Sequence, residues 1–223
     1  MSANRDVRSE TVAVIGLGRF GGQVAQSLAR QGHDVIGIDS SQEIVDQWAD
    51  ALTHVVQADA TNDAALRQLG VGNLGRVVVG IGADLEASVL SVLALVELRI
   101  PEIWAKAITP KHGKILSAVG AHHVVYPEAA MGDRVAHLIT SKLVDYIEFD
   151  DGFAIAKTRT PGEAVDHTLA DSALRTRYGI TVVGVKRAGE DFTYARPETL
   201  VRRGDLLIVA GRREQVERFA AST

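Results

Sequence analysis

The chain has 223 residues, 46% of them hydrophobic and 23% charged, which excludes an intrinsically disordered chain and allows a sizeable buried core. The formal net charge of −4 provides no overall attraction to phosphates, so we expect no nucleic-acid partner. The absence of cysteine excludes disulfides, thiolate metal sites and a cysteine nucleophile, and it favours an intracellular protein.

The N-terminus and the longest apolar run both bear on the membrane. Residues 1–10 are polar and lack the apolar core of a signal peptide, so we expect a disordered tail there. The run from Ala87 to Val96 is bounded by Glu86 and Glu97 and is far shorter than the about 20 residues that a membrane helix needs. Any membrane function is therefore expected to depend on a partner.

Short apolar strands alternate with helices over residues 11–128. β-Branched runs that stop at glycine or polar residues predict strands at 11–16, 35–38, 54–57, 77–79, 103–107 and 124–125. Helical spacing and capping residues predict helices at 22–31, 41–49, 62–69, 85–99 and 110–119. Because parallel strands need crossover connections, we expect a Rossmann-like, doubly wound parallel sheet in an α/β N-lobe.

The pattern changes after Glu128. Residues 129–147 are expected to form one connector helix, whose apolar stripe consists of Met131, Val135, Leu138, Ile139 and Leu143. Over 148–221 the sequence predicts strands at 153–158, 180–186, 191–194 and 205–210 and helices at 169–178 and 213–220. These elements indicate a small α+β C-terminal lobe. A lobe of this size has a marginal core, so burial against another copy is expected.

The helix over 85–99 is apolar on more than one side. One stripe contains Leu85, Val89, Val92, Leu93 and Val96, while Leu90, Leu95 and Leu98 fall outside it. A helix with two apolar faces needs two packing partners. The sheet is one of them, and the other is either a second subunit or the connector.

A glycine-rich motif follows the first strand directly and begins a helix. Gly16-Leu17-Gly18-Arg19-Phe20-Gly21 has the form GxGxxG. Gly16 would make the tight turn, Gly18 would let backbone approach a pyrophosphate, and Gly21 would let the helix pack on the sheet. The alternative is that these glycines only turn a tight corner. Asp39, at the end of the second strand, is placed to bind ribose hydroxyls and to disfavour NADP.

Three further positions each have a functional and a structural interpretation. Arg19 would reach terminal phosphates or be a solvated surface side chain. Asp59-Ala60-Thr61 would line an adenine pocket, or Thr61 or Asn62 would cap the next helix. Glu128 would face a ligand or stabilise the N-terminus of the connector helix.

No motif indicates catalysis. His122 and His123 are adjacent and would point to opposite sides of a strand, so a shared metal is not expected. The sequence has no GxSxG elbow, no Walker loop, and no lysine or tyrosine evidently placed for hydride transfer. We therefore expect no catalytic residues. The expected cofactor-binding residues are Gly16, Gly18, Arg19, Phe20, Gly21, Asp39, Ser40, Asp59, Ala60, Thr61, Ile81 and Gly82.

These motifs together resemble the RCK (regulator of K⁺ conductance) family, in particular its KtrA/TrkA-type cytosolic regulatory subunits of bacterial potassium uptake systems. The resemblance is carried by residues 14–22, 32–35 with Asp39, 58–61, 103–107 and 126–128. Residues 169–186 resemble the TrkA-C lobe of that family, so the resemblance covers nearly the whole chain. Tyr126 stands where a histidine is common in relatives.

The resemblance implies a regulator that binds ATP, ADP or NAD(H). It implies a dimer-based octameric ring that docks on a KtrB/TrkH-type membrane K⁺ pore subunit at the inner face of the plasma membrane, so that nucleotide exchange gates the pore. By resemblance Arg19 lies at the phosphates, Asp39 binds ribose, and Glu128 helps to hold an activating Mg²⁺, Ca²⁺ or Na⁺. Arg175 and Arg177 would serve a cyclic di-AMP site in the C-lobe. The rival functions are an NAD-dependent oxidoreductase and a stand-alone NAD(H) or nucleotide sensor.

Overall fold

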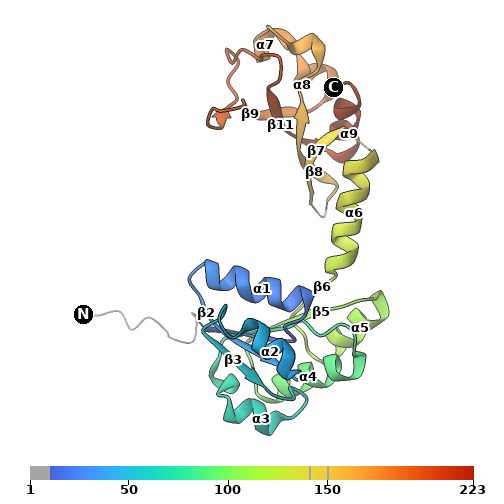
Figure 1. The fold of residues 1–223 in the computed structure, drawn as a ribbon. Helices are drawn as coiled ribbons and strands as arrows, with labels where there is room; N and C mark the ends of the chain where they lie inside the picture. Colours follow the sequence, from blue (N-terminus) through green and yellow to red (C-terminus); the bar gives the residue numbers. More distant parts are fainter. Residues whose placement is uncertain (1–10, 141, 150) are drawn as a thin grey trace, which may run out of the picture. The chain divides into compact units, whose positions relative to one another are not determined.

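The computed structural model describes residues 11–140, 142–149 and 151–223. The tail expected at residues 1–10 lies outside the described residues. The chain divides between Glu128 and Ala129 into two compact units, called here the N-terminal and C-terminal units (Figure 1). No helix among the described residues combines the length and the apolar character needed to span a bilayer.

The N-terminal unit contains a six-stranded parallel sheet in the order β3-β2-β1-β4-β5-β6. Its strands are β1 (Thr11–Ile15), β2 (Asp34–Asp39), β3 (His54–Gln57), β4 (Arg76–Val79), β5 (Glu102–Lys106) and β6 (His123–Val125). The strand order reverses between β1 and β4, so the sequence-based prediction of a doubly wound sheet is confirmed. Ligands in such sheets bind beyond the carboxyl ends of the strands at this reversal.

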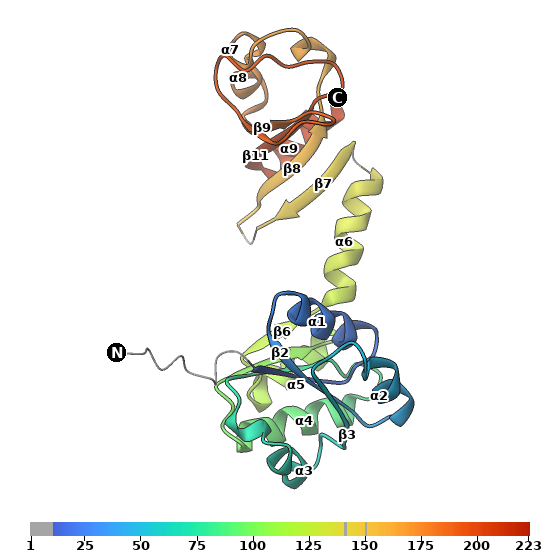
Figure 2. The same cartoon turned by 60° about the vertical axis from the view of Figure 1, so that its left-hand side comes forward.

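Helices cover both faces of this sheet (Figure 2). They are α1 (Arg19–Arg30), α2 (Gln42–Trp48), α3 (Asp63–Gln68), α4 (Leu85–Glu97) and α5 (Pro110–Val119). Because successive strand residues face opposite sides, Val14 packs in the core beneath α1 and α2, whereas Ala13 and Ile15 pack in the core beneath α3, α4 and α5. The central strand is thus buried on both faces, which explains its continuous apolar sequence.

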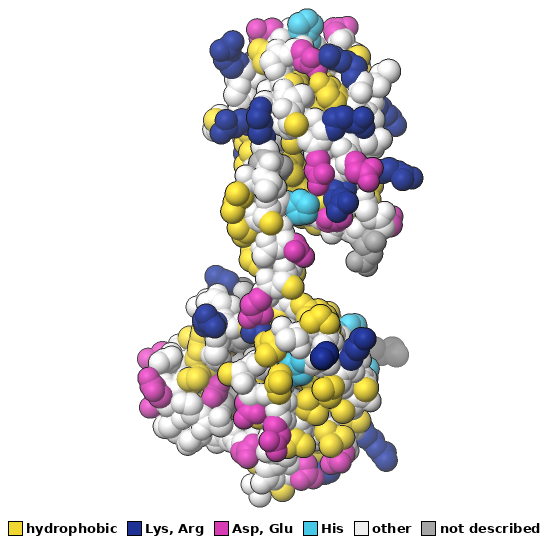
Figure 3. Space-filling view, turned by 90° about the vertical axis from the view of Figure 1, so that its right-hand side faces the viewer, with side chains coloured by type: hydrophobic (Ala, Val, Ile, Leu, Met, Phe, Trp, Pro, Cys, Tyr) yellow, Lys and Arg dark blue, Asp and Glu magenta, His cyan; other side chains and the backbone are white. Residues whose placement is uncertain are grey.

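The buried face of α4 differs from the expected stripe. Ser88, Ser91, Val92, Ala94 and Leu95 are the buried residues of this helix. Two leucines of the expected stripe are on the outside instead, and α4 exposes Leu85 (48%), Leu90 (39%) and Leu93 (39%). Small Ser and Ala residues lie on the buried side because they let the helix approach its neighbours closely. Figure 3 shows hydrophobic side chains gathered on the N-terminal unit on the side that carries α5.

The C-terminal unit contains a five-stranded antiparallel sheet in the order β10-β9-β11-β8-β7. Its strands are β7 (Leu143–Glu148), β8 (Phe153–Arg159), β9 (Thr181–Lys186), β10 (Thr193–Tyr194) and β11 (Leu206–Arg212). Its helices are α6 (Pro127–Thr140), which begins just before the unit boundary, α7 (Leu169–Ser172), α8 (Leu174–Tyr178) and α9 (Arg213–Ala221). Phe219 of α9 is fully buried in its core.

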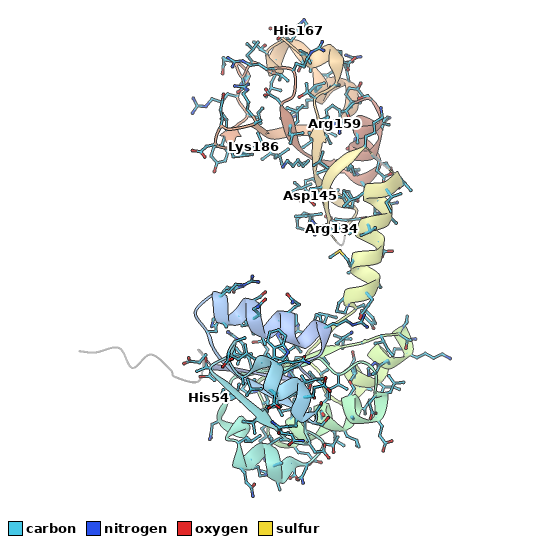
Figure 4. All side chains as sticks on the ribbon, in the orientation of Figure 1. His54, Arg134, Asp145, Arg159, His167 and Lys186 are labelled. Atoms are coloured by element: carbon cyan, nitrogen blue, oxygen red, sulfur yellow. The ribbon has the colours of Figure 1, made fainter. Side chains whose placement is uncertain are left out.

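The expected extent of the connector helix is wrong. Helix α6 ends at Thr140, and strand β7 begins at Leu143, where pairing with β8 buries Leu143 and Tyr146. The sheet competes successfully for these apolar residues because it provides both backbone partners and a core. Arg134 of α6 and Asp145 of β7 form an ion pair at 2.5 Å (Figure 4). The helix expected over 169–178 is interrupted as well, because Ala173 adopts a φ of 50° between α7 and α8.

Candidate functional site

A cleft of about 510 Å³ opens where the strand order of the parallel sheet reverses. Every residue expected in the site lines this cleft except Gly21, and Glu128 lines it too. Lining residues that were not expected in the site include Ala83, Asp84, Ala87, Ser91, Lys106 and Ile108. One cavity therefore collects side chains from both halves of the sheet.

The glycine-rich loop has the geometry that its motif predicts. Gly16 has a φ of +81°, and a Cβ there would lie 2.9 Å from Cγ1 of Ile81. A Cβ on Gly21 would lie 1.9 Å from the carbonyl oxygen of Gly16, so Gly21 is required for close packing of α1 against the loop. Gly18 is the N-cap of the 12-residue helix α1 and borders the cleft. The first amides of α1 thus lie at the cleft, and such amides favour bound anions.

Asp39 holds the glycine-rich loop in place. Its side chain is 9% exposed, Oδ2 accepts a hydrogen bond from the amide of Leu17 at 2.7 Å, and Oδ1 accepts one from the amide of Ser41 at 3.0 Å. A carboxylate oxygen has two lone pairs, so each oxygen retains capacity for a ligand hydroxyl. Asp39 therefore has a structural role in the loop besides the ribose contact predicted for it.

Trp48, which was not among the expected site residues, contacts the same loop. Its indole Nε1 donates a hydrogen bond to the carbonyl oxygen of Leu17 at 3.0 Å. A Cβ on Gly22 would lie 2.2 Å from Cζ2 of Trp48, so the ring rests against the first turn of α1. Leu17 is therefore held by its amide and by its carbonyl.

Asp59 and the cap of α3 are separate features. Oδ1 of Asp59 accepts hydrogen bonds from the hydroxyl of Thr61 at 2.7 Å and from its amide at 2.9 Å. These bonds, that from the hydroxyl first, lower the pKa of Asp59 below its ordinary value. The N-cap of α3 is Asn62, whose side chain accepts from the amides of Ala64 and Ala65. Asp59 and Thr61 thus face the cleft while the neighbouring Asn62 caps the helix.

Lys106 and Glu128 form an ion pair at the edge of the cleft. Lys106 ends β5, Glu128 lies in the first turn of α6, and Nζ lies 2.5 Å from Oε1. The hydrogen bond from Lys106 is the main cause that lowers the pKa of Glu128, and the charge of Arg19 contributes in the same direction. Glu128 therefore lies in the first turn of α6 and at the cleft, and its contact with a ligand stays a prediction. A lysine ending an apolar strand at this edge was the available sequence signal for Lys106.

The histidines and the arginines of α8 lie away from this cleft. Nδ1 of His122 accepts a hydrogen bond from the amide of Ile103, and His123 stacks on Trp104 with a centroid distance of 4.0 Å. Within the described part of the chain, no group of three or more His, Asp or Glu side chains is arranged to hold a metal ion. Arg177 pairs with Glu163 at 2.9 Å in the C-terminal unit. Cyclic di-AMP binding by Arg175 and Arg177 stays a prediction.

The parallel sheet, the glycine-rich loop and the cleft at the reversal define a Rossmann-like domain, here joined to a small antiparallel lobe. The TrkA-N domain matches residues 12–127, and the TrkA-C domain matches residues 158–222. The chain is 36% identical over 214 residues to Ktr system potassium uptake protein A of Bacillus subtilis (strain 168), covering 96% of each chain. The protein therefore belongs to the RCK family and has the TrkA-N and TrkA-C domains of its KtrA/TrkA-type members.

Solved structures show the same fold. The GsuK RCK domain superposes with a TM-score of 0.67 at 19% identity, covering 100% of this chain and 48% of that one. The protein thus spans about half the length of that GsuK chain. The structure of GsuK bound to ADP gives a TM-score of 0.51 at 28% identity, covering 60% of this chain and 36% of that one.

Proposed function

We propose that this protein is a nucleotide-binding regulatory subunit that gates potassium flux through a membrane partner. The observation that carries the proposal is the arrangement of Gly18, Arg19 and Asp39 around one cleft, in a chain 36% identical to a Ktr system potassium uptake protein. The proposal assigns no catalytic residue. Among the described residues, no observation favours the alternatives from the sequence, an oxidoreductase and a stand-alone sensor.

The proposed ligand is an adenine nucleotide, ATP or ADP, with NAD(H) as a further candidate. Its ribose would lie at Asp39 and Ser40, and its base near Asp59, Ala60 and Thr61. Its phosphates would lie at the amides of α1 and the guanidinium of Arg19, where the helix N-terminus and a cation both favour negative charge. The GsuK structure bound to ADP, which shares the fold at 28% identity, supports this ligand class.

Glu128 is the proposed protein ligand of an activating Mg²⁺, Ca²⁺ or Na⁺. Hard cations prefer several oxygen ligands, which one carboxylate does not provide. Phosphate oxygens of the nucleotide would therefore have to complete the site. The residues fit this arrangement because Glu128 lines the same cleft as the glycine-rich loop and its side chain is 64% exposed.

Gating would act through a ring of subunits on a KtrB/TrkH-type pore subunit at the cytoplasmic face of the membrane. A nucleotide shifts a conformational equilibrium only by its differential affinity for the two shapes. Triphosphate and diphosphate differ most near Arg19 and Glu128, so ATP with a cation would select one ring shape and ADP another. Exposed apolar residues on α4 and α5, including Leu90, Leu93 and Ile115, support burial against another copy, and the dimer-based octamer is proposed from the family resemblance.

Calorimetry with ATP, ADP, NADH and NADPH tests the nucleotide site. We expect binding of at least one of the first three ligands, and loss of that binding in Gly18→Val and Asp39→Ala. Unchanged affinity in both variants would show that the site is misassigned. A panel of keto acids and aldehydes with NADH tests the absence of catalysis, and steady NADH oxidation would contradict the regulatory function.

A further inference from the structure

Lys106 is a largely buried cation at the edge of the cleft. Its side chain is 11% exposed and lines the cleft, as Ser91 and Ile108 also do. A Cβ on Gly82 would lie 3.2 Å from its Nζ, and the ring of Phe20 lies with its centroid 5.7 Å from the same atom. The ammonium group thus lies near the backbone of Gly82 and the ring of Phe20, and its ionic partner is Glu128. A cation removed from water in this way needs an anionic partner.

Its partner in the described structure, Glu128, is in a different environment. The Glu128 side chain is 64% exposed, against 11% for Lys106. Glu128 can therefore leave the pair and be solvated by water at little cost, whereas Lys106 cannot. A terminal phosphate carries more charge and more acceptor oxygens than a carboxylate, so it is the stronger partner for a confined ammonium group.

We propose that Lys106 exchanges its partner from Glu128 to the terminal phosphate of a bound adenine nucleotide, so that affinity depends on phosphate number. This inference rests on the proposed nucleotide function. The exchange would release Glu128 at the moment when phosphate oxygens enter the cleft. Through Lys106, the affinity would depend on the charge of the ligand. The carboxylate of Glu128 would become available to a cation only after the phosphates have bound.

The first test measures the affinity for AMP, ADP and ATP by calorimetry in metal-free buffer. We expect wild-type affinity to rise with phosphate number. Lys106→Gln should weaken ATP binding about tenfold, the loss expected for one charge-assisted hydrogen bond, and AMP binding by less than about twofold. The matched control is Lys111→Gln, because Lys111 is exposed on α5 and does not line the cleft.

The outcomes separate this inference from the proposed function. If Lys106→Gln weakens the affinity for AMP and ATP equally, or leaves the affinity for ATP unchanged, Lys106 does not bind the terminal phosphate and the inference is overturned. Retained AMP affinity also reports that the variant is folded around an intact cleft. Failure of the wild type to bind any of the three nucleotides would instead overturn the nucleotide function itself.

A double-mutant cycle tests the exchange of partners. Glu128→Gln should raise ATP affinity in metal-free buffer because it frees Lys106 and removes a carboxylate near the phosphates. The gain should be larger in the wild-type background than in the Lys106→Gln background, because the ion pair is broken on binding only where Lys106 is present. Equal gains in the two backgrounds would show that Glu128 acts by repulsion alone, and the exchange would be rejected.

Discussion

The indole Nε1 of Trp48 donates a hydrogen bond to the carbonyl oxygen of Leu17 at 3.0 Å, and this bond ties α2 to the glycine-rich loop. The amide of the same residue, Leu17, is bound by Asp39. The loop that forms one wall of the cleft is therefore held from both sides by residues outside it. A preorganised loop binds phosphates without the cost of ordering its backbone.

Trp48→Phe should weaken nucleotide binding several-fold and lower the free energy of unfolding by about 1 kcal/mol, because the ring packing is largely kept while the donor to Leu17 is lost. Calorimetry and urea unfolding measure the two effects. Trp104→Phe is the matched control, since its indole donates to Glu102 and Trp104 does not line the cleft. An equal loss of nucleotide affinity in both variants would contradict the role of Trp48.

Gly21→Ala should abolish nucleotide binding and lower the free energy of unfolding by about 2–3 kcal/mol, because its Cβ would overlap the backbone carbonyl of Gly16. Gly132→Ala is the control, since a Cβ at that α6 position has no neighbour within 4 Å and φ is not positive. This control should instead stabilise the protein by up to about 1 kcal/mol. Thermal unfolding followed by circular dichroism compares the two, and a stable Gly21→Ala variant that binds nucleotide would contradict the packing argument.

The buried carboxylate of Asp205 should make the stability of the C-terminal unit depend on pH. Its carboxylate is 1% exposed and accepts two hydrogen bonds of 2.8 Å from Arg187 and one of 2.8 Å from the amide of Arg202. Burial raises the pKa of Asp205, but these hydrogen bonds outweigh it and place the pKa below the ordinary value of 3.8. A lowered folded-state pKa stabilises the protein above that ordinary value, and the stabilisation is lost as the pH falls through the lowered pKa.

Asp205→Asn should therefore lower the free energy of unfolding at pH 7 by on the order of 3 kcal/mol, because it leaves Arg187 without its charged partner. The variant should also lose less stability than the wild type as the pH falls below about 4. Urea unfolding between pH 7 and pH 3 measures both effects. Asp191→Asn is the control, because Asp191 is exposed, and it should retain the acid dependence of the wild type. Identical pH profiles for Asp205→Asn and the wild type would contradict the assignment.

The exposed leucines of α4 predict self-association. Leu93→Asp should reduce the mass measured by light scattering while leaving the circular dichroism spectrum unchanged, because Leu93 is 39% exposed and a carboxylate there opposes burial against another copy. Gln68→Asp adds the same acid at an exposed position of α3 and should leave the mass unchanged. A wild-type protein with the mass of one chain at micromolar concentration would contradict the proposed ring.

The sequence alone determined the fold class and most of the glycine-rich wall of the cleft. These features depend on local patterns: a β-branched strand, a GxGxxG turn before a helix, and an acid at the end of the second strand. Each of these features can be predicted within one βαβ unit, because it depends on local backbone sterics and on the spacing of apolar residues. The alternation of strands and helices then predicted a doubly wound sheet, because crossover connections between parallel strands are right-handed and leave few other arrangements.

Only the tertiary structure decided which distant residues meet. Lys106 and Glu128 are 22 residues apart, and Trp48 and Leu17 are 31 apart, so no local pattern connects them. The end of α6 depended on the pairing of β7 with β8, which competes with helix formation for the same apolar residues. The buried face of α4 depended on close packing at Ser88 and Ser91, because a helix that is apolar on several sides carries no periodic signal for the side that packs.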